Sequence, residues 1–246
     1  MAAAGWLLSL ARDNVSHVDV LWSLMFLAAG VVYFLALDEA GTRAVVVLVL
    51  LTAWSIRLAG YIARRNRGEP EDHRYRSIRA NNEPNFRFKS LYIVFGLQGA
   101  LAWFISLPLM AAMSGDAPLG WLDAAGIALW SVGMVFEAIG DWQLARFRRD
   151  PSNANRVLDR GLWRYTRHPN YFGNFCIWWG FYLLALAAGG WWSLASPILM
   201  TVLLLKVSGV SLMESTITSR RPGYADYVRR TNAFFPGPPR AAGGSR

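Results

Sequence analysis

Ionisable side chains stand inside apolar stretches of this sequence, where burial is costly and usually serves a function. They are Asp19, Arg57, Asp123, Glu137, Asp141 and Lys206. Glu137 and Asp141 are four residues apart and Arg148 follows seven later, so all three share one face if the segment is helical. Arg57 and Lys206 have the alternative of reaching the membrane surface on their long stems. Carboxylates have no such stems and cannot reach the membrane surface in this way, so we expect Glu137 and Asp141 to contact a bound ligand.

An arginine-rich segment precedes one of the apolar stretches. Residues 159–174 read DRGLWRYTRHPNYFGN and continue into an apolar run. Pro169 suits the first turn of a helix, so we expect a helix N-terminus there, which favours an anion. The arginines around it have the planar fork that suits phosphate: Arg148, Arg156, Arg160, Arg164 and Arg167. The pattern favours a phosphorylated ligand such as a nucleotide. Two alternatives explain the arginines without a nucleotide. They bind lipid headgroups, or the chain generally uses arginine in place of lysine, as in 23 of its 25 basic residues.

Six apolar stretches are long enough to cross a bilayer, which takes about 20 residues. They cover residues 18–37, 44–62, 91–113, 119–142, 171–188 and 191–213. A shorter apolar piece, residues 2–11, lacks the marks of a signal peptide and predicts an interfacial helix or a shortened first span. The predicted fold class is an all-α integral membrane protein, a bundle of six to seven transmembrane helices in one domain over residues 1–246. Residues 237–246, rich in Gly, Pro and Ala, are expected to form a disordered tail.

The connections between these stretches alternate in charge. Residues 64–89 hold eight basic against four acidic side chains, residues 143–169 hold seven arginines, and six more arginines follow Met213. The connections with almost no positive charge are residues 38–43, 114–118 and 189–190. The positive-inside rule therefore places the basic segments and the C-terminus in the cytoplasm. Because each basic cluster adjoins a span, anionic membrane lipid explains it and nucleic acid is not expected as a partner.

The composition excludes several classes of protein. Charged residues make up 17% of the 246, whereas a soluble domain has about 25%, and the net charge is +9. The single cysteine, Cys176, excludes a disulfide framework and a cysteine-based metal site. The three histidines lie far apart and lack the spacing of metal ligands. The sequence therefore predicts a membrane protein that holds no metal.

The chain resembles the membrane steroid 5α-reductase superfamily, and within it the bacterial branch. The resemblance rests on RGLWRYTRHPNYFGN, MESTITSRRPGYADYVRRTNAFFP, RLAGYIARRNRGEPEDHRY and NVSHVDVLWSLMF. Sterol reductases and isoprenylcysteine carboxyl methyltransferases carry related C-terminal halves. The resemblance implies a seven-span helical bundle with a cytosol-facing cavity for NADPH, in a bacterial inner membrane.

The resemblance also implies the residues of a site. Those implied to bind NADPH are Glu137, Asp141, Arg148, Arg156, Arg160, Arg167, His168, Asn170, Tyr171, Asn174, Tyr224, Tyr227 and Arg229. Asn174 stands where the family usually has Glu, so it keeps hydrogen bonding but lacks the charge. The eukaryotic reductases place a Gln-Glu pair and a tyrosine at the substrate ketone. The early spans of this chain have no such pair, and Asp19 and Tyr61 are the nearest positions, so they are the predicted catalytic residues.

The activity implied is NADPH-dependent reduction of a conjugated C=C bond in a lipophilic enone, such as a 3-oxo-Δ4 steroid. Hydride would reach the β carbon while Asp19 or Tyr61 donates a hydrogen bond to the carbonyl oxygen. One alternative is a methyltransferase that uses S-adenosylmethionine, a cofactor without phosphate that would leave the arginine cluster unexplained. Another is a lipid-binding membrane protein without enzymatic activity.

Overall fold

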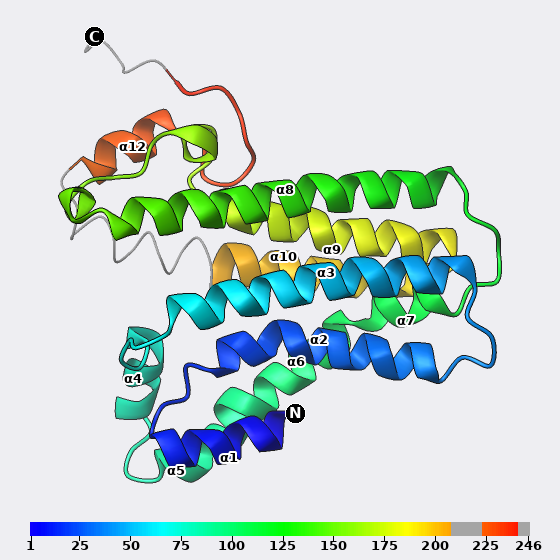
Figure 1. Ribbon diagram of the computed structural model, residues 1–246, viewed down its shortest axis with the longest axis horizontal. Helices are drawn as coiled ribbons and strands as arrows, with labels where there is room; N and C mark the ends of the chain where they lie inside the picture. The colour runs from blue at the N-terminus through cyan, green and yellow to red at the C-terminus, as the bar shows by residue number, and fades with distance from the viewer. Residues whose placement is uncertain (208–222, 241–246) are drawn as a thin grey trace. The chain divides into compact units, whose positions relative to one another are not determined.

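The computed structural model describes residues 1–207 and 223–240, and all regular structure in this part of the chain is helical. The chain divides into two compact units. The first comprises Met1–Leu119 and Ala185–Ser196, and the second comprises Gly120–Leu184 and Pro197–Arg246. Figure 1 shows the helices in chain order. The single membrane domain expected over residues 1–246 stays a prediction.

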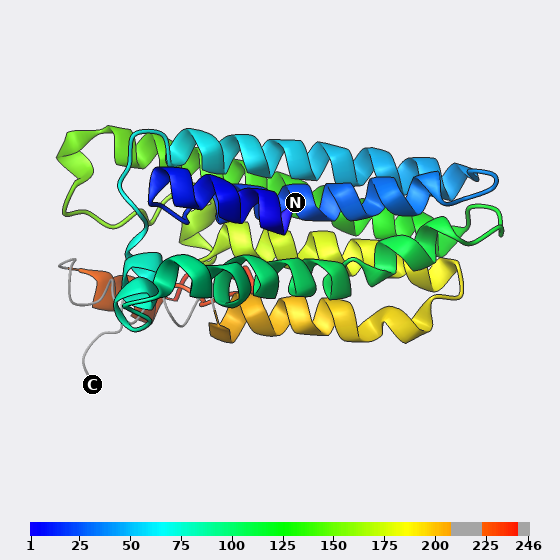
Figure 2. The ribbon, with the colours of Figure 1, turned by 90° about the horizontal axis from the view of Figure 1, so that it is seen from below.

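The first unit is built around two antiparallel helices, α2 and α3, which lie side by side (Figure 1, Figure 2). Its helical elements are α1 (Ala2–Arg12), α2 (Val18–Leu35), α3 (Thr42–Arg65), α4 (His73–Ala80), α5 (Phe86–Ser90), η1 (Leu91–Gly96), α6 (Leu97–Ile105), α7 (Leu107–Met113) and η4 (Trp191–Leu194). Phe26 and Trp54 are fully buried between α2 and α3, with ring centres 5.8 Å apart. Large side chains at this contact therefore form the core of the unit.

The expected span at residues 91–113 is part of one apolar run, Phe86–Met113, with two irregular points. η1 winds as a π-helix, and the helix is interrupted between α6 and α7, where Pro108 occupies the first turn of α7. At this break Tyr33 of α2 hydrogen-bonds to Ser106, with 2.8 Å between the hydroxyl oxygens. The polar side chain at the break is thus hydrogen-bonded within the unit, as an apolar environment requires.

The short helix α1 packs against α2 and η1. Trp6 Nε1 donates to the carbonyl of Arg87 over 2.8 Å, and a His17 ring nitrogen lies 2.8 Å from the carbonyl oxygen of Gly5. The 11 residues of α1 extend for about 16 Å, roughly half the hydrocarbon thickness of a bilayer. The helix is therefore too short to be a complete span by itself.

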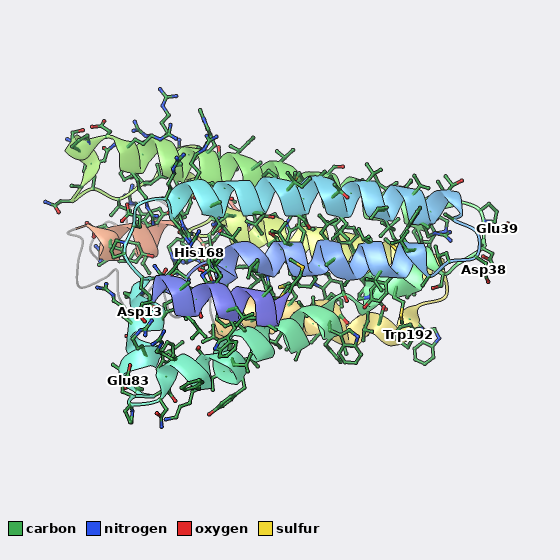
Figure 3. All side chains as sticks on the ribbon, turned by 60° about the horizontal axis from the view of Figure 1, so that its bottom comes forward. Asp13, Asp38, Glu39, Glu83, His168 and Trp192 are labelled. Carbon is green, nitrogen blue, oxygen red and sulfur yellow. The ribbon has the colours of Figure 1, made fainter. Side chains whose placement is uncertain are left out.

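The two ends of the first unit carry different connections. Asp38 and Trp192 lie at one end, and Asp13 and Glu83 lie at the other (Figure 3). Glu83 belongs to the basic segment that follows α3, whereas Asp38 belongs to the connection with almost no positive charge. The alternation of charge along the sequence thus corresponds to opposite ends of this unit.

Arg43 is a basic residue on the weakly charged side, and it is buried, with 2% of its surface exposed. Its Nη1 donates to the carbonyl of Gly115 over 3.3 Å, and its Nη2 donates to the carbonyl of Pro118 over 3.2 Å. The guanidinium therefore ties the start of α3 to the connection that follows α7.

Substituting Arg43→Met is expected to lower the free energy of unfolding by about 2 kcal/mol, because two charge-assisted hydrogen bonds are lost while the apolar stem is kept. The measurement is the midpoint of thermal unfolding of the detergent-solubilised chain. Arg12→Met is the control, since Arg12 is exposed at the end of α1. Equal midpoints for the two variants would show that Arg43 does not hold this connection.

The second unit is built on two long helices, α8 (Trp121–Arg149) and α9 (Pro169–Ala187). Its other helical elements are η2 (Pro151–Asn153), η3 (Gly161–Arg164), the larger part of α10 (Ala195–Val202), η5 (Leu203–Val207) and α12 (Tyr224–Arg230). The fully buried side chains include Trp178 and Phe181 of α9, whose ring centres are 5.7 Å apart. These rings form the centre of the unit.

Glycines seven residues apart bring α8 and α9 into backbone contact. On α8, Gly126 faces Gly180 and Gly133 faces Gly173, while Gly140 faces the first turn of α9. A Cβ added to Gly133 would lie 2.5 Å from the carbonyl oxygen of Gly173, and one added to Gly180 would lie 2.8 Å from that of Gly126. Small residues at such positions let membrane helices pack closely. The contact fixes which residues of α8 lie beside the start of α9.

Four helical segments are long and apolar enough to cross a membrane, and they support an integral membrane protein. They are Val18–Leu35, Thr42–Arg65, Phe86–Met113 and Trp121–Arg149. Aliphatic side chains on them are exposed, such as Val32 at 62% and Val49 at 60%, as lipid contact requires. The four segments correspond to the first four predicted spans. The full count of six to seven stays a prediction, and residues 208–213 of the last predicted span lie outside the described residues.

Candidate functional site

Two buried carboxylates of α8 lie beside the first turns of α9. Glu137 and Asp141 are each 3% exposed. Asn170 Nδ2 donates to Asp141 Oδ1 over 3.3 Å. A Cβ added to Gly173 would lie 2.5 Å from the backbone nitrogen of Glu137, so α8 and α9 touch at this level. The structure therefore brings together three residues that the sequence assigned to one site, Glu137, Asp141 and Asn170.

The segment before α9 is fixed to α8 by local contacts. Trp163 Nε1 in η3 donates to the carbonyl of Gly140 over 3.2 Å. Gly140 has no side chain, and a Cβ there would lie 3.2 Å from the backbone nitrogen of Asn170. The absence of a side chain at Gly140 thus lets the N-terminus of α9 approach α8.

Three further predicted residues lie just before α9 or in its first two turns. His168 immediately precedes the helix and is 3% exposed. Its ring stacks on that of Tyr171, with centres 5.5 Å apart and planes 9° apart. Asn174 is buried one turn after Asn170. The start of α9 therefore combines buried polar side chains with a helix N-terminus, an arrangement that favours an anionic or polar ligand.

Arg167 and Tyr227, both predicted to bind the cofactor, are bonded to backbone carbonyls. Arg167 is 8% exposed, and its Nη1 donates to the carbonyls of Thr231, over 2.6 Å, and Val228, over 3.2 Å. The Tyr227 hydroxyl donates to the carbonyl of Trp163 over 2.6 Å. Both side chains therefore hold α12 and the residues after it against the segment before α9, a role that the sequence did not predict. Their contact with a cofactor stays a prediction.

The residues after α12 run back along the start of α9. Thr166 Oγ1 donates to the carbonyl of Phe234 over 2.8 Å, and the backbone nitrogen of Gly237 donates to the carbonyl of Tyr165 over 3.1 Å. Four phenyl rings pack together at this contact: Phe172, Phe175, Phe234 and Phe235. Gly237, the first residue of the predicted disordered tail, is thus bonded to the segment before α9. The disordered tail over residues 237–246 stays a prediction, and residues 241–246 lie outside the described residues.

The other predicted cofactor residues differ in exposure. Tyr224 is buried and its ring centre lies 5.8 Å from that of Tyr227. Arg229 is exposed and forms an ion pair with Asp226. The remaining arginines are exposed on the second unit: Arg148, Arg156 and Arg160. A guanidinium group has the planar shape that suits phosphate oxygens, and binding of phosphate by these three arginines stays a prediction.

The first unit holds a separate polar cluster around Asp19. Tyr75 Oη donates to Asp19 Oδ1 over 2.6 Å, and Arg74 Nη2 donates to Asp19 Oδ2 over 2.8 Å. Gln98 Nε2 donates to the Tyr75 hydroxyl oxygen over 3.2 Å. Asp19 accepts in each of its contacts with these residues. The Tyr75 hydroxyl is thus the donor in its contact with Asp19, and the catalytic roles of Asp19 and Tyr61 stay predictions.

The pKa values of Tyr75, Arg74 and Asp72 are shifted by their contacts in and next to this cluster. Burial, and then the negative charge of Asp19, raise the pKa of Tyr75 well above its usual value. Burial lowers the pKa of Arg74, but the charge of Asp19 and the hydrogen bond to Asp72 outweigh it and raise the pKa. Burial raises the pKa of Asp72, but hydrogen bonds from Arg74 outweigh it and lower the pKa. Tyr75 thus keeps its proton, and Arg74 and Asp72 stay charged.

Contacts to the connection before α2 position this cluster. Arg79 Nη2 donates to Glu71 Oε1 over 2.9 Å, and the same carboxylate oxygen accepts from the backbone nitrogen of Val15 over 3.0 Å. The backbone nitrogen of Asp72 donates to Ser16 Oγ over 2.8 Å. The residues EDHRY that begin at Glu71 are thereby fixed next to the start of α2.

Sequence reasoning missed Tyr75 and Gln98 as members of a site. It assigned Tyr61 instead, which lies on α3 one turn before Arg65, and Arg65 Nη2 is 4.0 Å from Asp19 Oδ2. The available signal was the EDHRY segment, in which a tyrosine stands among charged residues. Among the residues that the structure describes, no group of three or more His, Cys, Asp or Glu side chains could hold a metal ion.

The chain is similar to proteins of fungal and mammalian origin. Uncharacterized protein C594.04c of Schizosaccharomyces pombe is 26% identical over 265 residues, which cover 94% of this chain and 75% of that protein. The 3-oxo-5-alpha-steroid 4-dehydrogenase 1 of Mus musculus is 39% identical over 65 residues, which are 26% of each chain. No solved structure matches the chain. Residues 5–231 match the family described as "Protein of unknown function (DUF1295)", and the chain therefore belongs to this family.

Proposed function

We propose that this protein is a membrane reductase of the steroid 5α-reductase superfamily, which uses NADPH to reduce a conjugated C=C bond in a lipophilic enone such as a 3-oxo-Δ4 steroid. The observation that carries the proposal is the local similarity to a 3-oxo-5-alpha-steroid 4-dehydrogenase, although it covers only about a quarter of that protein. The apolar helices agree with a substrate that enters from the bilayer. The proposed location is a bacterial inner membrane, with the C-terminus in the cytoplasm.

The residues at the start of α9 fit a dinucleotide. Buried carboxylates at Glu137 and Asp141 are suited to accept hydrogen bonds from ribose hydroxyls, and the N-terminus of α9 is suited to a phosphate. Exposed Arg148, Arg156 and Arg160 would supply charge for further phosphates. Asn170 is already oriented by its hydrogen bond to Asp141, so little ordering would accompany binding.

In this proposal one group of residues binds the nucleotide and another group supplies the proton. NADPH supplies the hydride when it is bound. The buried polar residues of α8 and α9 orient the nucleotide and exclude water from it. The proton source is a hydroxyl group: Tyr61, or Tyr75, whose proton is shared with Asp19. Asp19 acts by positioning Tyr75 and Arg74 through its two carboxylate oxygens.

Binding of NADPH, NADH and S-adenosylmethionine to the detergent-purified chain tests the proposal. We expect NADPH to bind much more tightly than NADH, because in this proposal arginine side chains bind the 2′-phosphate, which NADH lacks. Replacing Asp141→Asn is expected to weaken NADPH binding about tenfold, since a charged acceptor for a hydroxyl is lost. The readout is the dissociation constant from calorimetry or from nucleotide fluorescence.

The control for Asp141→Asn is Asp116→Asn, which removes an exposed carboxylate from the connection after α7. If S-adenosylmethionine bound and neither nucleotide did, the result would contradict the proposed reductase and favour a methyltransferase. If none of the three ligands bound, the protein would be a lipid-binding membrane protein without this chemistry.

A further inference from the structure

A depression on the second unit gathers four arginines from three parts of the chain. It measures about 610 Å³ and is lined by Asp159, Arg160, Gly161, Arg164, Arg230, Thr231, Pro239 and Arg240. Arg160 precedes η3 and Arg164 is its last residue, whereas Arg230 is the last residue of α12. Arg240 belongs to the returning segment, residues 231–240, which follows α12. Only Asp159 opposes their charge within the lining. The depression therefore has an excess of three positive charges.

The arginines are held in place by the backbone that carries them. The nitrogen of Arg240 donates to the carbonyl of Arg230 over 2.8 Å, which places the two residues side by side. Gly161 has a φ of 64°, a conformation that favours glycine, and a Cβ there would collide with the Gln143 side chain. Gln143 Oε1 in turn accepts from the nitrogen of Leu162 over 3.0 Å. Backbone hydrogen bonds and the conformation of Gly161 thus hold the segments that line the depression.

The positive charge in the depression is weakly compensated. Arg230 Nη2 lies 3.4 Å from Asp159 Oδ2, and Arg240 Nη2 lies 3.4 Å from the Asn232 side-chain oxygen. The side chain of Arg164 makes no hydrogen bond or ion pair with the residues that the structure describes. Four guanidinium groups gathered around one carboxylate repel one another, so a bound anion would stabilise the arrangement.

Two exposed aromatic side chains are close in sequence to residues that line the depression. Tyr165 is 45% exposed and follows Arg164, while Phe235 is 60% exposed and belongs to the returning segment. Exposed aromatic rings beside basic residues at the end of an apolar helix are typical of the headgroup region of a membrane.

We infer that this arginine depression binds the phosphate headgroup of an anionic phospholipid. The guanidinium groups would contact the phosphate oxygens, and the neighbouring aromatic rings would lie at the level where acyl chains begin. Arg160 is also among the residues assigned to NADPH, whereas Arg164, Arg230 and Arg240 are not, so the inference is tested at residues outside the proposed nucleotide site.

The test is lipid binding by the full chain, purified in detergent and stripped of lipid. Phosphatidylglycerol and phosphatidylcholine with the same acyl chains are titrated, and bound lipid is measured by native mass spectrometry. We expect the wild-type chain to bind phosphatidylglycerol more tightly. The double variant Arg164→Gln, Arg240→Gln should bind it about tenfold more weakly or worse, with phosphatidylcholine unaffected.

The control is the double variant Arg76→Gln, Arg149→Gln, which removes two exposed charges outside the depression and should bind lipid as the wild type does. Equal losses in both double variants, or no loss in either, would overturn the inference. Arg240→Gln alone, checked by circular dichroism, separates loss of binding from loss of structure, because it should still reduce affinity in a folded chain.

Two further titrations identify the source of the phosphate. Glycerol phosphate, at the same phosphate concentration, should not displace phosphatidylglycerol, since it lacks the acyl chains. Displacement by glycerol phosphate would mean a soluble phosphate ligand, and displacement by NADPH would mean a nucleotide subsite. Either displacement would overturn the lipid assignment, whereas a failure of NADPH to bind anywhere would leave it intact and remove only the proposed reductase.

Discussion

Replacing Gly173 by alanine is expected to lower the free energy of unfolding by about 3 kcal/mol, at the upper end of the cost of overpacking a core. A Cβ at this position would lie 2.5 Å from both the nitrogen of Glu137 and the carbonyl oxygen of Gly133. Both atoms belong to the backbone of α8, which cannot rotate away as a flexible side chain can. The helices must therefore separate, which also moves Glu137 and Asp141 away from the start of α9.

Thermal unfolding of the detergent-solubilised chain measures this effect, and NADPH titration measures its consequence for the site. Gly60→Ala is a matched control, because Gly60 lies within α3 and a Cβ there would meet nothing within 4 Å. Alanine has the higher helix propensity, so this control should leave the midpoint unchanged or raise it. If Gly173→Ala unfolded at the wild-type midpoint, α8 and α9 could not be in the backbone contact described.

Replacing Asp19 by asparagine is expected to reduce turnover at least about 100-fold while NADPH still binds, provided the protein is the proposed reductase. Asp19 Oδ1 and Oδ2 accept from Tyr75 and Arg74, so an amide would lose the charge and present a donor in place of one acceptor. The hydroxyl of Tyr75 would then lose its orientation. Arg74 keeps its hydrogen bonds to Asp72, which limits the loss of stability.

The measurement follows NADPH oxidation and product formation with a 3-oxo-Δ4 steroid. Tyr61→Phe and Tyr75→Phe, tested in parallel, decide which hydroxyl supplies the proton. Asp38→Asn and Tyr92→Phe are the controls, since both residues are exposed. Wild-type turnover in all three test variants would remove this cluster from the mechanism, and lost turnover together with lost NADPH binding would indicate a general structural defect.

The sequence predicted the elements well because hydropathy and charge are local properties. The first four apolar stretches correspond to the segments long enough to cross a membrane, and Pro169 marks the start of α9. The four-residue spacing of Glu137 and Asp141 correctly predicted that both carboxylates are on one face of a helix. Their burial follows from this position, because that face of α8 packs on α9.

The spacing of the glycines in α8 and α9 is a sequence pattern that could have predicted the contact between these helices. The spacing of Gly126, Gly133 and Gly140, and of Gly173 and Gly180, is seven residues in both helices. This period is a sign of close helix packing in membranes, and it identifies which two helices meet. Composition and span length do not contain this information, because they do not depend on the order of small residues within a stretch.

The sequence by itself determined where the first four apolar helices form and which connections are basic, since both depend on residues close together in the chain. Only the tertiary structure decided the partners of individual side chains. Arg167 bonds to a carbonyl 64 residues away, and Tyr75 bonds to a carboxylate 56 residues away. A guanidinium binds a phosphate and a backbone carbonyl through the same N–H groups, so its residue type leaves the partner open and the packing of distant segments selects it.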